Sequence, residues 1–208
     1  MRTRVKICGI TRVEDGLAAA RLGADAVGLV FYAKSPRVVN VVQAQALVRV
    51  MPPFVSVVGL FVDADPLEIR RVLEAVPLDM LQFHGNESAE ACRGYGRPYI
   101  KVVHMEKGTD VLNLARPYGD AAGILVDTYV AGVPGGTGRS FEWSSLPTDL
   151  PCPMILAGGL TPENVAAAVS RVRPWAVDVS GGVEAAPGIK DAAKIAAFIR
   201  GVNSVQID

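Results

Sequence analysis

Short runs of apolar and β-branched residues recur along the chain, and stretches with helical periodicity separate most of them. Eight runs are predicted to be strands: 5–8, 26–31, 55–62, 80–84, 99–105, 123–128, 154–158 and 176–180. Because strand and helix alternate, parallel pairing is expected. Eight repeats favour a closed (β/α)8 TIM barrel over an open doubly wound sheet, and residues 1–208 are expected to form a single domain.

The predicted helices cover residues 11–24, 41–51, 65–76, 87–96, 161–172 and 189–200. Thr11 is a candidate N-cap and Gly23 a candidate stop for the first of them. Pro66 and Pro162 are expected in the first turns of their helices, where a missing N–H costs nothing. Residues 135–150 have little helical periodicity and are expected to form a long loop with a short helix.

Composition narrows the possible functions. Half of the 208 residues are hydrophobic, and 21 basic residues balance 21 acidic ones, so no net charge favours nucleic acid or an anionic membrane. The three cysteines form no C-x-x-C pair, which argues against a disulfide scaffold or structural zinc. With no apolar signal core at the start and no apolar run near about 20 residues, a cytoplasmic protein with a small-molecule partner is expected.

Several predicted strands carry polar residues at positions of the same parity. Strands of a parallel sheet are covered on both faces, so polar residues within them need a reason. Side chains alternate along a strand, which places these residues on one face, and we expect that face to point into the barrel. They also lie late in their strands, at the rim where barrel enzymes build active sites. This set comprises Lys6, Cys8, Gln82, His84, Asp127, Asp178 and Ser180.

Each of these residues also has a purely structural interpretation. A lone cysteine in a strand is usually an inert small hydrophobe. An inward aspartate could form a core ion pair with Lys6 or Lys101, and His84 could be a hydrogen-bonded core histidine. The shared parity and the shared rim favour a functional site over these separate interpretations.

Glycine-rich loops follow the seventh and eighth predicted strands. Gly158 and Gly159 lie in the first, and Ser180, Gly181 and Gly182 begin the second. Backbone N–H groups of such loops can approach an anion, so both are candidate phosphate-binding loops, although tight strand-to-helix turns would have the same composition. A third loop, with Gly135, Gly136, Thr137 and Gly138, is interpreted as a lid or as a flexible surface loop. Arg37 follows Pro36 and could present its guanidinium to a carboxylate.

Seven segments together resemble the phosphoribosylanthranilate isomerase family of tryptophan biosynthesis. They are KICGIT, DAVGLVFYAKSPR, LQFHG, ILVDT, GGTGRSFEW, LAGGLTPENV and DVSGGVE followed by PGIKD, and they run in order from Lys6 to Asp191. The resemblance implies a monofunctional (β/α)8 enzyme that converts N-(5-phosphoribosyl)anthranilate to 1-(2-carboxyphenylamino)-1-deoxyribulose 5-phosphate by an Amadori rearrangement. No cofactor or metal is implied, and the protein is expected to be a monomer or homodimer.

The resemblance also assigns roles. It makes Cys8 the general base and Asp127 the general acid, and it has Arg37 bind the anthranilate carboxylate. His84 and Asp178 would line the substrate, and Lys6 is expected to be a further substrate-binding residue. From its place on the same strand face as Cys8, Lys6 would also favour the Cys8 thiolate. Asp127 must start protonated and is therefore expected to be buried. Where the family commonly has Ser-Ser-Gly, this chain has Ser180-Gly181-Gly182, so phosphate contact is expected to rest on backbone N–H groups.

Three other classes of function remain possible on the sequence. Ribulose-phosphate epimerases and thiamine-phosphate synthases share the glycine loops, but an epimerase would need metal ligands, and His84 and His104 are expected to face opposite ways. A silent sugar-phosphate binder is a second possibility, although binding alone requires neither an inward Cys8 nor Asp127. A bifunctional isomerase that also accepts the aminoaldose of histidine biosynthesis is a third.

Overall fold

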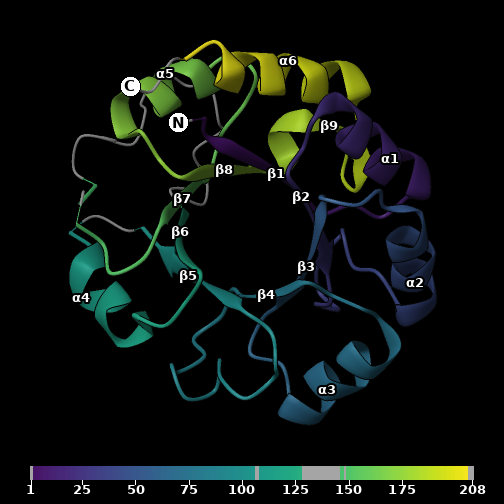
Figure 1. Cartoon of the computed structure of the whole chain (residues 1–208), viewed down its shortest axis with the longest axis vertical. Helices are drawn as coiled ribbons and strands as arrows, with labels where there is room; N and C mark the ends of the chain where they lie inside the picture. Colours follow the sequence, from purple (N-terminus) through teal and green to yellow (C-terminus); the bar gives the residue numbers. More distant parts are fainter. Residues whose placement is uncertain (1, 106–107, 128–145, 148, 206–208) are drawn as a thin grey trace.

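Eight parallel strands form a closed barrel in which each strand pairs with the next and β8 pairs with β1 (Figure 1). The computed structural model describes residues 2–105, 108–127, 146–147 and 149–205. The strands are β1 (Arg4–Cys8), β2 (Ala26–Val30), β3 (Ser56–Phe61), β4 (Met80–Phe83), β5 (Tyr99–His104), β6 (Gly123–Asp127), β7 (Met154–Ala157) and β8 (Ala176–Val179). The predicted strands are confirmed to within about two residues at each end, and the (β/α)8 barrel is confirmed.

Helices cover the outside of the barrel, as Figure 1 shows. They are α1 (Val13–Leu22), α2 (Val41–Val50), α3 (Pro66–Ala75), α4 (Val111–Ala115), α5 (Val165–Val172) and α6 (Ala192–Asn203). Short 3-10 turns, η1 (Arg116–Tyr118) and η3 (Gly181–Val183), and a small hairpin, β9 (Glu184–Ala186) with β10 (Ile189–Lys190), complete the described elements. In the described residues no helix is long and apolar enough to cross a bilayer.

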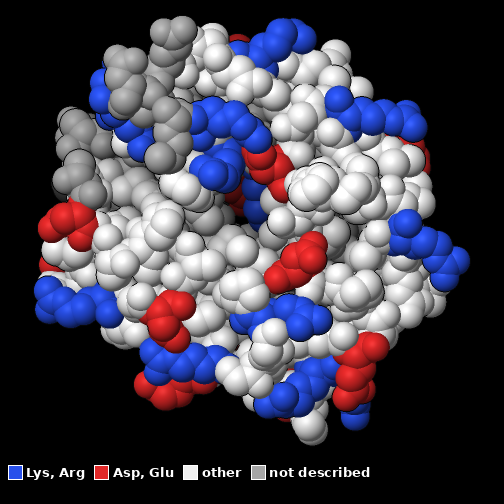
Figure 2. Space-filling view, in the orientation of Figure 1, with Lys and Arg blue, Asp and Glu red and all other residues white. Residues whose placement is uncertain are grey.

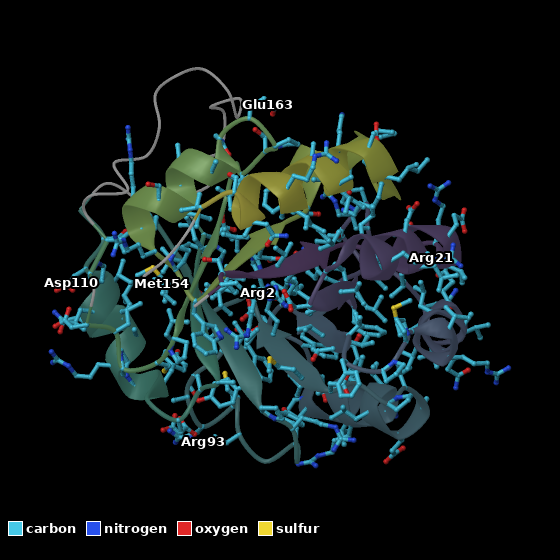
Figure 3. The ribbon with its side chains drawn as sticks, turned by 45° about the horizontal axis from the view of Figure 1, so that its top comes forward. Arg2, Arg21, Arg93, Asp110, Met154 and Glu163 are labelled. Carbon is cyan, nitrogen blue, oxygen red and sulfur yellow. The ribbon has the colours of Figure 1, made fainter. Side chains whose placement is uncertain are left out.

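Side chains project from both faces of the strands (Figure 3), and their alternation gives an apolar layer on each side. The larger layer lies between strands and helices and includes Ile7, Val27 and Phe61. The smaller one fills the barrel interior and includes Ile100, Val102, Leu125 and Ile155. The predicted inward face is therefore the interior face. On the face that Figure 2 shows, basic and acidic side chains are interspersed, as the balanced composition indicates.

Helix starts follow local chemistry where a side chain caps them. Asp65 accepts from the Leu67 N–H, and Pro66 occupies the first turn of α3 as predicted. Gly23 ends α1 in the left-handed conformation, at φ 101°, which is the predicted stop.

Three expectations about helices are wrong. Thr11 does not cap α1, because its hydroxyl donates to the Gly188 carbonyl and the helix begins two residues later. Pro162 precedes α5, whose N-cap is Asn164. Residues 87–96 form turns instead of a helix: Glu87 accepts from the backbone N–H groups of Asp63 and Gly85 and pairs with Lys101 at 2.8 Å, which fixes the segment as a loop.

Candidate active site

A cavity of about 850 Å³ opens at the carboxyl ends of the strands. This is the end of a (β/α)8 barrel at which active sites are built. Its lining comes from loops and strand ends all around the barrel, and it includes ten of the predicted site residues. They are Cys8, Arg37, His84, Asp127, Gly158, Gly159, Asp178, Ser180, Gly181 and Gly182. The predicted lid residues Gly135, Gly136, Thr137 and Gly138 lie outside the described part of the chain.

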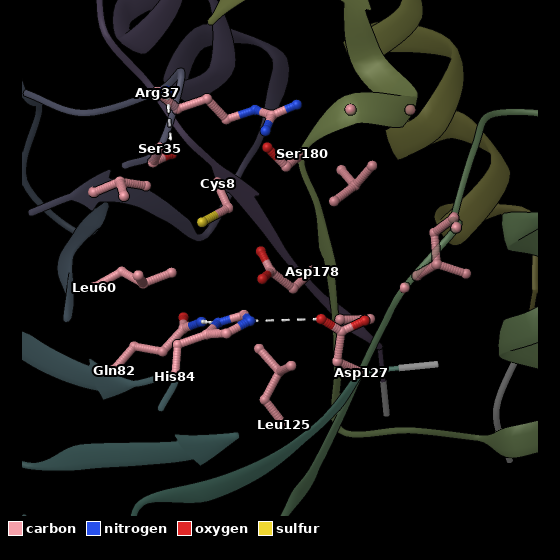
Figure 4. A pocket seen from close by; sticks show the side chains of 18 of the residues that line it. Cys8, Ser35, Arg37, Leu60, Gln82, His84, Leu125, Asp127, Asp178 and Ser180 are labelled. Atoms are coloured by element: carbon pink, nitrogen blue, oxygen red, sulfur yellow. Dashed lines mark hydrogen bonds and ion pairs between the residues drawn. The ribbon is translucent and has the colours of Figure 1, made fainter. Parts of the chain in front are cut away.

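Cys8 and Asp127 project into this cavity from well-separated strands (Figure 4). Cys8 ends β1 and Asp127 ends β6, and two strands lie between these on one side of the barrel and four on the other. The Cys8 residue is 6% exposed and packs with Val30 and Leu60. The Asp127 side chain is 18% exposed, so the burial expected for it is partial. A molecule within the cavity could contact a thiol and a carboxyl group at once.

Lys6 lies on the same face of β1 as Cys8, two residues before it and deeper in the barrel. Its ammonium pairs with the Asp178 carboxylate at 3.0 Å, and both side chains are nearly buried. The core ion pair considered from the sequence therefore exists between these two residues. Asp178 reaches the cavity, whereas Lys6 is not among the described residues that line it.

The ionisation of Cys8 reflects several opposing influences. Burial raises the pKa of its thiol, the Lys6 ammonium lowers it, and the Asp178 carboxylate raises it. The net effect is a raised pKa. Lys6 thus favours the thiolate, as expected, but burial outweighs this contribution. The cavity holds Cys8 mainly as the thiol near neutral pH, and only the minor thiolate form can accept a proton.

Gly28 makes room for Cys8, a role that the sequence did not reveal. It pairs with Cys8 across β1 and β2. A Cβ atom at Gly28 would lie 2.8 Å from the Cys8 Sγ and 3.2 Å from the Lys6 Cε. Only glycine therefore leaves both side chains where they are.

Arg37 reaches the cavity and is held there by Glu184. Its Nε and Nη2 donate to the two carboxylate oxygens of Glu184 at 2.8 and 2.7 Å. Lys190, whose side chain is 1% exposed, donates to the same carboxylate at 2.8 Å and also to the Ser180 carbonyl and hydroxyl. Burial alone would raise the pKa of Glu184, but the two cations lower it to about 2. Sequence reasoning missed Glu184 and Lys190, which lie outside the predicted strands.

One edge of the Arg37 guanidinium is therefore occupied by Glu184. A guanidinium has five N–H donors, and the Nε and Nη2 bonds use two of them. The Nη1 group remains for another partner. This leaves an edge able to bind a carboxylate while the other edge is fixed.

His84 and His104 lie side by side, and the prediction that they face opposite ways is wrong. Their ring centroids are 5.0 Å apart, and the His104 Nε2 lies 3.0 Å from the His84 carbonyl. The His84 Nε2 lies 3.6 Å from the Asp127 carboxylate (Figure 4). The physical reason is the orientation of Lys101, which points out of the barrel to Glu87, so that His104, three residues later, points inward.

The two glycine-rich loops contact one another at the cavity. Gly158 and Gly159 have φ values of 87° and 62°, a conformation that favours glycine. A Cβ at Gly182 would lie 1.9 Å from the Leu160 carbonyl oxygen, so the second loop can approach the first only with glycine there. Backbone groups of both loops are thus brought together at one corner of the cavity, as an anion-binding site requires.

Comparison with known proteins extends the likeness over nearly the whole chain. Residues 5–201 match the family model described as N-(5'phosphoribosyl)anthranilate (PRA) isomerase. The chain is 62% identical over 205 residues to N-(5'-phosphoribosyl)anthranilate isomerase of Pseudomonas aeruginosa. The aligned region covers 99% of this chain and 97% of that protein.

Solved structures agree with this match. Phosphoribosyl anthranilate isomerase from Thermotoga maritima is 42% identical, has a TM-score of 0.87 and covers 98% of this chain and 100% of its own. A second structure, of monomers of the dimeric enzyme from that organism, is 40% identical with a TM-score of 0.85 and the same coverage. A third, in complex with reduced 1-(o-carboxyphenylamino)-1-deoxyribulose 5-phosphate, is 41% identical with a TM-score of 0.84, again at 98% and 100% coverage.

Proposed function

This chain belongs to the N-(5'-phosphoribosyl)anthranilate isomerase family, and we propose that Cys8 and Asp127 exchange the protons of its reaction. The enzyme catalyses the Amadori rearrangement of N-(5-phosphoribosyl)anthranilate to the aminodeoxyribulose phosphate, a step of tryptophan biosynthesis. The observation that supports the roles of the two residues is their position: a thiol and a carboxyl group reach one cavity from well-separated strands. This is the arrangement that an acid and a base on opposite sides of a sugar require.

The reaction begins with ring opening. The Asp127 carboxyl group donates its proton to the furanose oxygen, the bond from that oxygen to C1 breaks, and a protonated Schiff base forms between C1 and the anthranilate nitrogen. The Cys8 thiolate then removes the proton from C2, and the electron pair moves to give the enolamine. Tautomerisation of the enolamine gives the ketone product.

Proton balance defines the starting state of the pair. One turnover converts the Cys8 thiolate to a thiol and the Asp127 carboxyl group to a carboxylate. The pair resets when one proton moves from the thiol to the carboxylate through water. Because burial raises the pKa of Cys8, the active form, with thiolate and protonated carboxyl, is a minor one near neutral pH.

The remaining cavity residues bind and orient the substrate in this proposal. The free edge of Arg37 binds the anthranilate carboxylate, and Glu184 fixes the plane of the guanidinium by its two hydrogen bonds. The loops with Gly158, Gly159, Gly181 and Gly182 bind the phosphate through backbone N–H groups. Ser180 contributes through its backbone, because its hydroxyl contacts Lys190 at 3.3 Å. His84 and Asp178 line the same cavity and contact the sugar.

Two features of the enzyme in the cell belong to the same proposal. Its partner is the sugar-phosphate substrate, and it acts as a monomer or a homodimer; the dimeric relative of T. maritima supports the second form. A cytoplasmic location agrees with the three cysteines, all of which are free thiols.

Loss of fluorescence from freshly made N-(5-phosphoribosyl)anthranilate tests the assignment directly. Cys8→Ala and Asp127→Asn are each expected to lose at least about 10²-fold in kcat, as removal of a general acid or base does. Cys92→Ala is the matched control, because Cys92 is a buried free cysteine that belongs to the layer outside the strands. Near-normal turnover by either folded variant would contradict the role of that residue.

A further inference from the structure

Three potential metal ligands gather at the ends of adjacent strands on one side of the cavity. His84 follows β4, His104 ends β5 and Asp127 ends β6, and His104 pairs with Asp127 in the strand register. One ligand atom from each residue lies within 4.8 Å of the other two. The His84 Nε2 and the Asp127 Oδ2 are 3.6 Å apart.

Neighbouring groups orient both imidazoles. The His104 Nε2 donates to the His84 carbonyl at 3.0 Å, so the Nδ1 is the nitrogen that would bind a cation. The Gln82 side chain lies 3.1 Å from the His84 Nδ1, and so turns the His84 Nε2 toward Asp127 (Figure 4). Metal-ligating histidines characteristically have their second nitrogen hydrogen-bonded in this way.

The Gln82 amide next to His84 can either donate or accept, depending on its orientation. Its side chain is fully buried, and the described structure contains no hydrogen-bond partner for its Oε1. When the His84 Nε2 binds a cation, the ring proton must lie on Nδ1, and a Gln82 amide in the reverse orientation accepts it through Oε1. The amide position 3.1 Å from the His84 Nδ1 can thus serve the tautomer that a metal-bound His84 requires.

The distances suit a small divalent transition metal. Zinc binds imidazole nitrogens and carboxylate oxygens at about 2.0 to 2.2 Å, so two ligands of a tetrahedral ion lie roughly 3.3 Å apart. The His84–Asp127 separation of 3.6 Å is near that value. The His104 residue is exposed, so a small shift of its ring that keeps the hydrogen bond to the His84 carbonyl can close the remaining distance. Three protein ligands leave a fourth position open toward the cavity.

We propose that His84, His104 and Asp127 form a binding site for a divalent transition-metal cation of the zinc class, and that its occupation inhibits the isomerase. Two imidazoles and one carboxylate favour zinc or copper over magnesium, which prefers oxygen ligands. The inhibition rests on the proposed role of Asp127, because a carboxylate bound to a cation cannot carry a proton. The binding itself does not depend on that role.

Titration calorimetry with Zn²⁺ on the untagged full-length protein tests the binding. The chain contains only two histidines, so His104→Gln removes one of the two imidazoles without touching a residue given a role in the reaction. The variant is expected to bind Zn²⁺ at least about tenfold more weakly and to keep its activity in a metal chelator. Equal Zn²⁺ affinity in both proteins would overturn the site. His84→Gln is expected to weaken Zn²⁺ binding by the same factor, and only its Zn²⁺ affinity is compared, because His84 has a proposed role at the substrate.

Two further measurements distinguish this site from a thiolate site and from binding without inhibition. Cys8→Ala is expected to bind Zn²⁺ with the same affinity as the parent. Co²⁺ bound to the parent should show no thiolate charge-transfer band. Loss of Zn²⁺ binding in Cys8→Ala would overturn the proposal in favour of a thiolate site. In the activity assay, Zn²⁺ is expected to inhibit the parent but not His104→Gln at the same concentration. Mg²⁺ is expected to inhibit neither protein. Binding that depends on His104 without inhibition would support the site, overturn the proposed inhibition and count against Asp127 as the acid.

Discussion

Alanine at position 28 is expected to displace the Cys8 sulfur and slow the reaction while the barrel stays folded. The new Cβ would lie 2.8 Å from the Cys8 Sγ and 3.1 Å from the Cys8 Cα. Ordinary contact needs about 3.5 Å or more, so the sulfur must move by roughly 0.7 to 1 Å. A misplacement of about 1 Å can cost about 10²-fold in rate, whereas overpacking of this size costs about 1 to 3 kcal/mol of stability.

Steady-state kinetics on Gly28→Ala, by loss of substrate fluorescence, measures the effect. We expect kcat to fall by about 10 to 10²-fold with little change in KM, because the binding groups at Arg37 and the glycine loops are untouched. Gly119→Ala is the matched control: its φ is −64°, and the nearest described atoms, from Arg116 and Pro151, would lie 3.9 Å from the added Cβ, which is ordinary contact. In a Cys8→Ala background Gly28→Ala should cause no further loss. A folded Gly28→Ala enzyme with normal kcat would refute the reasoning.

Two more predictions concern the Arg37 and Glu184 ion pair. Arg37→Ala should chiefly raise KM, and an unchanged KM would count against the carboxylate contact. Glu184→Gln should raise KM less, because the glutamine amide still holds the Arg37 guanidinium, although more weakly than the carboxylate does. Because the folded pKa of Glu184 is lowered from 4.5 to about 2, its ionised form contributes stability above pH 4.5 that is lost as the pH falls toward 2. The contribution is at most about 3 kcal/mol and less after solvent screening. In urea unfolding, the difference in free energy of unfolding between the parent and Glu184→Gln should therefore become smaller from pH 6 to pH 3. A difference that stays constant would contradict the assignment.

Much of the barrel follows from the sequence because its signals are local. Apolar runs and alternating parity placed Cys8, Asp127 and Asp178 on the inward face, and each reaches the cavity. The expected helix at 87–96 failed because Glu87 makes its contacts with Lys101 and with backbone groups of a neighbouring loop. Nothing in the local sequence discloses such contacts.

The parts of the site that were missed depend on distant segments. Glu184 appears in the sequence as one more charge after a glycine loop, and its partner Arg37 is 147 residues away. Gly28 is one glycine in a strand until its register with Cys8 is known. The orientation of His104 was predicted wrongly, because a short apolar run does not show which alternate positions face inward. Lys101 was interpreted as a possible inward residue, which would have made His104 point outward.

A crystal structure of this chain with reduced 1-(2-carboxyphenylamino)-1-deoxyribulose 5-phosphate would test the acid and base assignment most directly. We expect the Cys8 sulfur within about 3.5 Å of C2 of the sugar chain. The Asp127 carboxyl group should lie within hydrogen-bond reach, about 3.2 Å, of the hydroxyl formed from the ring oxygen, on the opposite side. A ligand that contacts Asp127 while C2 lies beyond reach of the sulfur, or that has both groups on one side, would contradict the account.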